Sequence, residues 1–138
     1  MRQELIFAPM IALAALTFGV LTLVPRRRFR AGRLKQVDAS DFRLGESTRV
    51  PPEVAMPNRN YMNLLELPVL FYVVCLGFYV VDGVDGAALA LAWAFVALRA
   101  AHTAVHLTSN NVFHRLRLFG LSVLVLAATW VWFAVTVF

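Results

Sequence analysis

Polar side chains recur at helical spacing inside two apolar stretches of the sequence. The two sets are Arg59, Asn63 and Glu66, spaced i, i+4, i+7, and Arg99, His102 and His106, spaced i, i+3, i+7. At about 3.6 residues per turn, each set forms a stripe on one face of a helix. A charged residue inside a membrane span costs about 2.5–3.5 kcal/mol on insertion scales and usually faces the interior of a bundle. These stripes are therefore the candidate site of binding or chemistry.

Three interpretations of the stripes are open at the level of the residues. Glu66 beside Arg99 would form a buried ion pair whose role is structural. The same groups, with Arg115 at similar depth, would instead form a pocket for an anion with several carboxylates, because arginine presents a planar fork to carboxylates. His102 and His106 place two imidazoles on one helix face, but a zinc site generally needs three or four ligands. No cysteine or second carboxylate lies near them in the sequence, so we expect no metal.

Four long apolar segments must position these groups: residues 5–25, 61–81, 87–107 and 116–138. Of the 138 residues, 60% are hydrophobic and 15% are charged, whereas soluble domains have about 45–50% and about 25%. A bilayer core about 30 Å thick needs roughly 20 helical residues, and β-barrel spans are shorter and alternate in polarity. The sequence predicts an all-α integral membrane protein with a four-transmembrane-helix bundle in a single domain, residues 1–138. The third segment is rich in alanine, which favours close packing, so we expect it at the centre.

The net charge of +5 is concentrated between the spans. Residues 26–60, the expected long loop, hold nine of the 13 basic residues and four of the eight acidic ones, and Arg115 and Arg117 follow the third span. The positive-inside rule puts both basic loops in the cytoplasm and both termini outside. The charge is thus a topology signal, compatible with contact between residues 26–35 and anionic lipid headgroups. We expect no nucleic-acid partner. The first apolar run is longer than the roughly 7–15 residues of a signal-peptide core, so we expect a retained helix.

The two stripes resemble the motifs of a known membrane-protein family. The sequence Arg99-Ala-Ala-His102-Thr103-Ala-Val-His106 resembles the third-helix signature of the MAPEG family (membrane-associated proteins in eicosanoid and glutathione metabolism). Residues 59–66, an arginine followed by Asn-x-x-Glu, are similar to its second-helix motif, and Arg115 stands at the spacing of the arginine after the third helix. The resemblance covers essentially the whole chain.

This resemblance implies a four-helix bundle assembled as a homotrimer, with glutathione bound between subunits near the cytoplasmic face. Its implied binding residues here are Arg59, Asn63, Glu66, Arg99, His102 and His106, and Arg115 is the implied catalytic residue. In enzymes of the family, an arginine or similar donor stabilises the glutathione thiolate, which attacks an electrophilic lipid or reduces a peroxide. The apolar substrate would arrive from the bilayer lipid.

Three positions depart from the family pattern. His106 stands where better-known enzymes carry a tyrosine, Met62 where a further arginine is common, and Pro68 follows Glu66 closely. The chain looks like the family's bacterial branch, which places it in a bacterial inner membrane. The expected function is a glutathione-dependent transferase or peroxidase acting on a hydrophobic electrophile. The alternatives are a non-catalytic membrane protein of the same fold that binds a lipid or a partner, and a purely structural oligomer.

Overall fold

The computed structural model describes residues 2–138, and these residues form an α-helical bundle. The elements are η1 (Gln3–Ile6), α1 (Phe7–Arg33), η2 (Ala39–Phe42), α2 (Pro52–Glu66), α3 (Pro68–Val80), α4 (Gly86–Leu107) and α5 (Val112–Val137). Helix accounts for 81% of the chain, and the described residues contain no strand. Four helical stretches are long and apolar enough to cross a membrane, with α2 and α3 together forming the second. The predicted all-α fold with four spans is confirmed.

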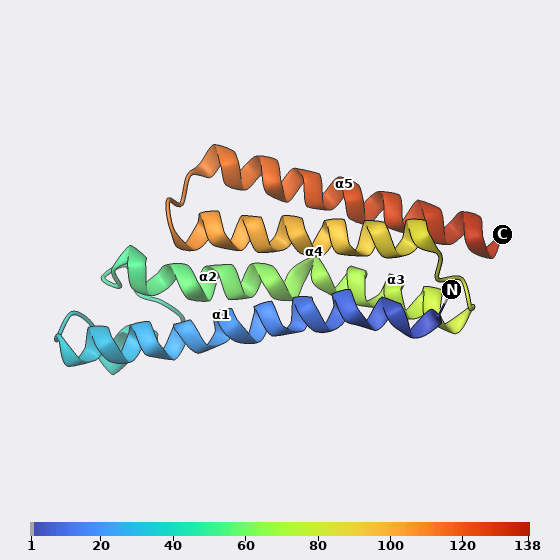
Figure 1. Ribbon diagram of the computed structural model, residues 1–138. Coiled ribbons are helices and arrows are strands. Elements are labelled where there is room, and N and C mark those ends of the chain that lie inside the picture. The colour runs from blue at the N-terminus through green and yellow to red at the C-terminus, as the bar shows by residue number, and fades with distance from the viewer. Residues whose placement is uncertain (1) are drawn as a thin grey trace.

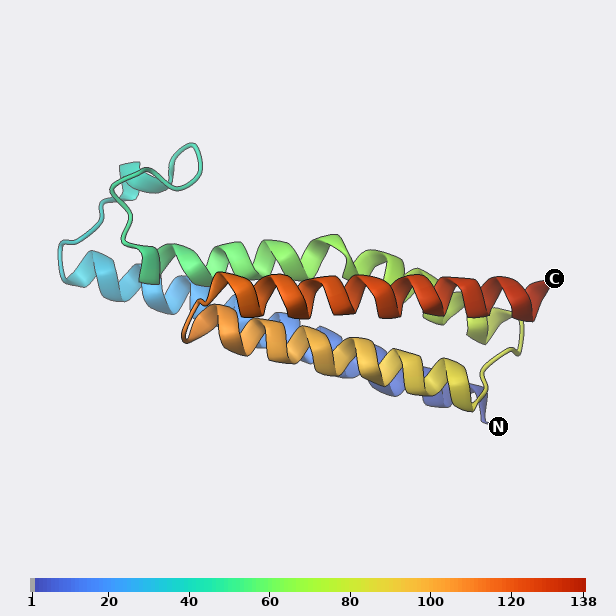
Figure 2. The same ribbon diagram turned by 90° about the horizontal axis from the view of Figure 1, so that it is seen from above.

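The four spans run antiparallel to their neighbours along the chain. Both termini and the α3–α4 connection lie at one end, which we call the terminal end (Figure 1). The long connection 34–51 and the α4–α5 turn lie at the other, the loop end, as the rotated view also shows (Figure 2). α4 packs most extensively on α5 and also contacts α1, α2 and α3, which confirms its expected central place. The fully buried core includes Leu13, Phe71, Phe78 and Phe95.

The helices extend beyond the apolar segments that predicted them. α1 continues through Pro25 to Arg33, and α2 begins at Pro52 and runs through Pro57. The segment without α-helix is therefore 34–51, shorter than the expected loop 26–60. The length of an apolar run reflects the thickness of the hydrocarbon core of the bilayer, and the helix that contains it can continue beyond that core into water. Pro52 stands in the first turn, where its missing N–H has no helical partner to lose.

The second span is broken where α2 meets α3. Leu67 separates the two helices, and Pro68 opens α3. Proline has no N–H to give to the carbonyl four residues earlier, here that of Leu64, and its ring crowds that carbonyl. Farther along, Gly77 lets α3 approach α5 closely, because a Cβ there would lie 2.8 Å from Cζ of Phe133.

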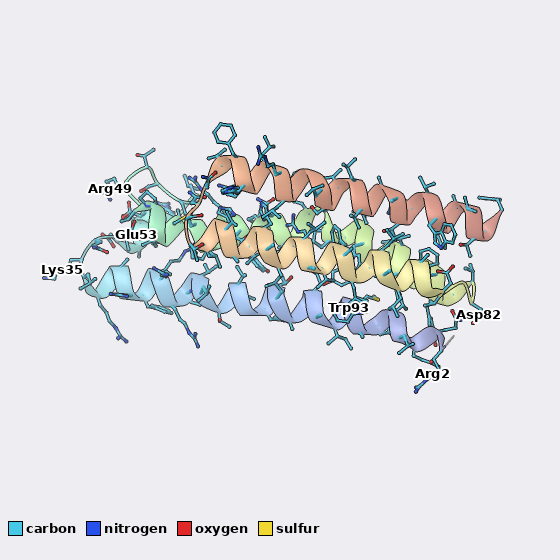
Figure 3. All side chains as sticks on the ribbon, turned by 45° about the horizontal axis from the view of Figure 1, so that its top comes forward. Arg2, Lys35, Arg49, Glu53, Asp82 and Trp93 are labelled. Atoms are coloured by element: carbon cyan, nitrogen blue, oxygen red, sulfur yellow. The ribbon has the colours of Figure 1, made fainter. Side chains whose placement is uncertain are left out.

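The connection 34–51 is held by one carboxylate. Asp41 accepts hydrogen bonds from the backbone N–H of Asp38 at 2.9 Å, the Ser47 hydroxyl at 2.7 Å and the Arg49 guanidinium at 2.9 Å. These contacts, that with the Asp38 backbone foremost, lower the pKa of Asp41 from its ordinary 3.8 to about 2. The charged side chains Lys35 and Arg49 lie at this loop end, opposite Arg2 at the terminal end (Figure 3).

Candidate functional site

The polar stripe of α4 faces the interior of the bundle. Arg99, His102 and His106 are all buried, and Arg99 has no exposed surface. Asp85 caps the N-terminus of α4 by accepting the backbone N–H of Ala88 at 2.7 Å, which satisfies one of the free donors of the first turn. The helix therefore begins with a defined cap, and its three-to-four-residue periodicity carries the stripe inward, as the sequence predicts.

Arg99 is bound by a backbone carbonyl rather than by a carboxylate. Its Nη2 donates to the carbonyl oxygen of Asn63 at 2.8 Å. This carbonyl belongs to the last turn of α2, so the end of that helix supplies an acceptor inside the span. Within residues 2–138, no carboxylate oxygen lies within 4.0 Å of the Arg99 guanidinium, although Glu66 lies in electrostatic range.

A cavity of about 270 Å³ opens beside this stripe near the loop end. It is lined by residues of α2, α4 and α5: Asn63, His102, Val112, Arg115, Leu116 and Phe119. The rings of His102 and His106 meet edge to face, with centroids 5.8 Å apart. The Phe119 ring lies 5.9 Å from the Arg99 guanidinium carbon, at the outer limit of a cation–π contact. The cavity thus joins cationic donors to an apolar wall.

The turn between α4 and α5 holds Arg115 in place. Nη1 of Arg115 donates to Oδ1 of Asn110 at 2.7 Å, and Asn110 has a φ of 49°, in the left-handed region that asparagine tolerates. Asn111 then caps α5 by accepting from the backbone N–H groups of Phe113 and His114. Two consecutive asparagines therefore end one helix, start the next and orient the arginine.

Several buried polar atoms of α2, α4 and α5 lack a hydrogen-bond partner within residues 2–138, and two of the residues that carry them, His102 and Arg115, line the cavity. They are Nδ2 and Oδ1 of Asn60, Nε and Nη1 of Arg99, Nδ1 of His102, Oγ1 of Thr103, Nδ1 of His106 and Nε of Arg115. A buried polar group without a partner costs about 1–3 kcal/mol, so six residues of this kind in one region indicate a site built to meet polar groups. Asn60 and Thr103 were missed by the sequence analysis. The sequence could have indicated both, because Asn60 is a polar residue next to Arg59 and Thr103 is a polar residue next to His102.

A model of the MAPEG family matches residues 6–135 of the chain. The chain belongs to the MAPEG family. It is thus an integral membrane protein of the family associated with glutathione and eicosanoid metabolism. Neither the curated proteins nor the solved structures contain a significant match to it.

The second-helix MAPEG motif is divided between two faces of α2. Asn60 and Leu64 lie on the buried face, whereas Arg59, Met62 and Glu66 are exposed. Asn63 is half-buried between them and is the one member of the predicted α2 stripe that lines the cavity. The expected meeting of two complete stripes is therefore only partial in one subunit: His102 of the α4 stripe and Asn63 of the α2 stripe line the cavity, and Arg99 contacts the Asn63 carbonyl.

Two arginines predicted from the sequence lie near the α4 stripe. Arg59 lies in electrostatic range of His106, as does Arg115. Within residues 2–138, no three His, Cys, Asp or Glu side chains lie close enough together to hold one metal ion. The cavity lining therefore carries one cation, Arg115, and the polar side chains Asn63 and His102, and Glu66 lies in electrostatic range of Arg99.

Proposed function

We propose that this chain is a glutathione-dependent transferase or peroxidase that acts on a hydrophobic electrophile. The observation that carries the proposal is the cavity at the loop end, which His102 and Arg115 line and whose lining residues Asn63 and Phe119 contact Arg99. All three residues, Arg99, His102 and Arg115, have a buried nitrogen without a hydrogen-bond partner within residues 2–138. A buried cationic cluster of this kind suits a ligand with more than one negative charge.

The residues fit the chemical groups of glutathione. Its two carboxylates match the free donors of Arg99 and His102, and its amine matches the acid Glu66, which has no ion-pair partner within 4.0 Å among the described residues. Bound glutathione would supply a sulfur nucleophile. Arg115 would stabilise the negative charge of that sulfur, because a neighbouring cation lowers the pKa of a thiol. Asn110 holds the arginine in orientation for this role.

The size of the cavity favours a site completed by a second subunit. Its volume of about 270 Å³ is below the roughly 300–1,000 Å³ of typical small-molecule sites. Glu66 is exposed on α2 next to the exposed apolar residues Leu65, Val69 and Leu70. A carboxylate on a lipid-facing surface is costly, and a neighbouring copy would cover it. We infer a homotrimer in which Arg59 and Glu66 of one subunit approach the cavity of the next.

The remaining roles follow from the same arrangement. Phe119, Leu116 and Val112 would exclude water from the reacting sulfur and admit an apolar substrate from the bilayer. The charge distribution supports cytoplasmic loops and outward termini in a bacterial inner membrane. The loop end of the bundle, with the cavity, would then open toward the cytoplasmic pool of glutathione.

The proposal is tested by the ultraviolet absorbance of the thiolate. Glutathione added at neutral pH to the detergent-solubilised protein should produce a thiolate difference spectrum, which Arg115→Ala should abolish. Arg117→Ala is the matched control, since it removes an equal charge from an exposed position on the same helix. Conjugation of chlorodinitrobenzene and reduction of cumene hydroperoxide should likewise be lost in Arg115→Ala and retained in the wild type and in Arg117→Ala. An Arg115→Ala protein with the full thiolate signal would overturn the catalytic role of Arg115.

A non-catalytic binding protein is the second candidate. It is favoured by Arg115, whose Nη1 is already engaged by Asn110, and by Met62, which brings no charge to the exposed face of α2. Under this alternative, glutathione or a lipid would protect the protein against thermal unfolding, yet no thiolate signal and no turnover would appear.

A further inference from the structure

A second cavity lies outside the candidate site, between the end of α1 and the connection 34–51. Its volume is about 570 Å³. The α1 wall is Val24, Pro25, Arg28, Phe29 and Gly32, which share one helix face, and the other wall is Val37, Asp38, Ala39 and Phe42. We call this cavity the α1 groove. We propose that it binds the headgroup and upper acyl chain of one anionic phospholipid.

The groove lies at the depth of the membrane surface. Its lower end, Val24 and Pro25, is the end of the first apolar segment, and arginines begin at the next residue. The eight helical steps from Val24 to Gly32 rise about 12 Å along the helix. A headgroup layer is about 5–8 Å thick on each side of the hydrocarbon core. The groove is thus long enough to cross the headgroups and reach the level of the acyl chains.

The walls of the groove match a phospholipid along this depth. Val24, Phe29 and Phe42 give an apolar surface, and Phe29 is 71% exposed, as suits an aromatic residue at a membrane interface. Arg28 lies between them, with its guanidinium 4.5 Å from the Phe42 ring centroid and 3.1 Å from the Glu46 carboxylate. Nε of Arg28 is buried and has no partner within residues 2–138. A phosphate oxygen would serve as the acceptor for this donor.

The surrounding charge selects an anionic lipid. Residues 26–46 hold seven basic and three acidic side chains, and α1 has no acid at all. Four further arginines on the same stretch of α1 are exposed and add to the local positive charge without lining the groove: Arg26, Arg27, Arg30 and Arg33. Each basic residue near an anionic surface strengthens binding by about fivefold. Asp38 on the opposite wall disfavours a second negative group, which limits the groove to one headgroup.

Native mass spectrometry of the delipidated full chain in detergent tests this site. Phosphatidylglycerol and phosphatidylcholine with the same acyl chains are titrated in turn. The wild-type protein should bind phosphatidylglycerol at least about fivefold more tightly. Gly32→Leu should fill the groove and weaken this binding by fivefold or more. Because a Cβ at Gly32 meets no atom within 4 Å and leucine favours helix over glycine, this variant should fold.

Gly19→Leu is the matched control, because Gly19 also lies on α1 with open space around it but away from the groove. Arg28→Gln is compared with Arg27→Gln, which removes the same charge outside the groove. Equal affinities of the two leucine variants, or equal losses in the two glutamine variants, would overturn the proposal in favour of diffuse charge. A groove that binds a peptide segment instead would show no preference for phosphatidylglycerol and would overturn it too.

Discussion

Replacing Arg99 with methionine should stabilise the bundle and remove ligand binding. Arg99 is completely buried and donates one hydrogen bond, to the Asn63 carbonyl at 2.8 Å. Its Nε and Nη1 have no partner within residues 2–138. Eight residues, or about 12 Å, separate it from the C-terminal end of α4 at Leu107, which places it well inside one leaflet.

The magnitude follows from two opposing contributions. A charge inside a span costs about 2.5–3.5 kcal/mol, and a hydrogen bond from a charged group returns about 1.5–3 kcal/mol. Methionine removes both and still fills irregular space in the core. We therefore expect Arg99→Met to raise stability by about 1 kcal/mol, which for a chain of this length raises the Tm by about 2–5 °C.

Thermal unfolding followed by circular dichroism in detergent measures the change, with and without glutathione. Leu98→Met is the matched control, because it places the same side chain at the adjacent position, where a swap of similar volume costs less than about 1.5 kcal/mol. Glutathione should raise the Tm of the control and leave that of Arg99→Met unchanged. A loss of more than about 2 kcal/mol in Arg99→Met would refute the reasoning. It would mean that Glu66 holds the guanidinium in a stabilising ion pair, and Glu66→Gln should then cost as much.

Three further predictions concern the rest of the bundle. Asn60→Leu removes two buried amide atoms that have no partner within residues 2–138. It should therefore raise the free energy of chemical unfolding by about 1 kcal/mol and weaken glutathione binding. A lower free energy of unfolding would instead indicate that a bound water is the partner of Asn60. Since the folded pKa of Asp41 is about 2, its contacts stabilise the connection 34–51 above the ordinary pKa of 3.8 and are lost as the pH falls from about 4 to about 2. Limited pepsin digestion should therefore spare this connection at about pH 4 and cut it near pH 2, and Asp41→Asn should already be cut at about pH 4. Gly77→Val should lower stability by about 1–3 kcal/mol, since its Cβ would lie 2.8 Å from the Phe133 ring; the same change at Gly19 should have little effect, and equal unfolding curves would contradict the close packing of α3 on α5.

The sequence predicts the four spans and the inward stripe of α4 because both depend on strong local features of the sequence, the length of an apolar run and the helical spacing of polar residues. A run of about twenty apolar residues is long enough to cross the bilayer as a helix. Three polar residues at i, i+3 and i+7 must share one face of that helix. Arg99, His102 and His106 are therefore buried as expected. The alanine-rich composition of α4 likewise predicts its central position, since small side chains allow several neighbours to approach.

The ends of the helices are harder to predict, because hydropathy measures the hydrocarbon and not the hydrogen bonding of the backbone. The last eight residues of α1 hold five arginines and no continuous apolar run, yet the helix continues through Pro25 to Arg33. There it forms one wall of the α1 groove. The fold of the connection 34–51 depends on Asp41 and its three partners, contacts that no periodicity encodes.

The pairing of the two stripes could not be predicted because α2 carries polar residues on more than one face. Asn60 is completely buried, Arg59 and Glu66 are exposed, and Asn63 is half-buried, so a periodicity argument has no single polar face to select. Arg99 then donates to the Asn63 carbonyl in the last turn of α2, an acceptor that no periodicity indicates, and not to the Glu66 carboxylate. In the proposed homotrimer, one contact with a second copy would cover the exposed carboxylate of Glu66 and bring polar groups to the buried nitrogens near the cavity. In that homotrimer, assembly and ligand binding would thus depend on the same residues, and each face of the motif would serve a different subunit.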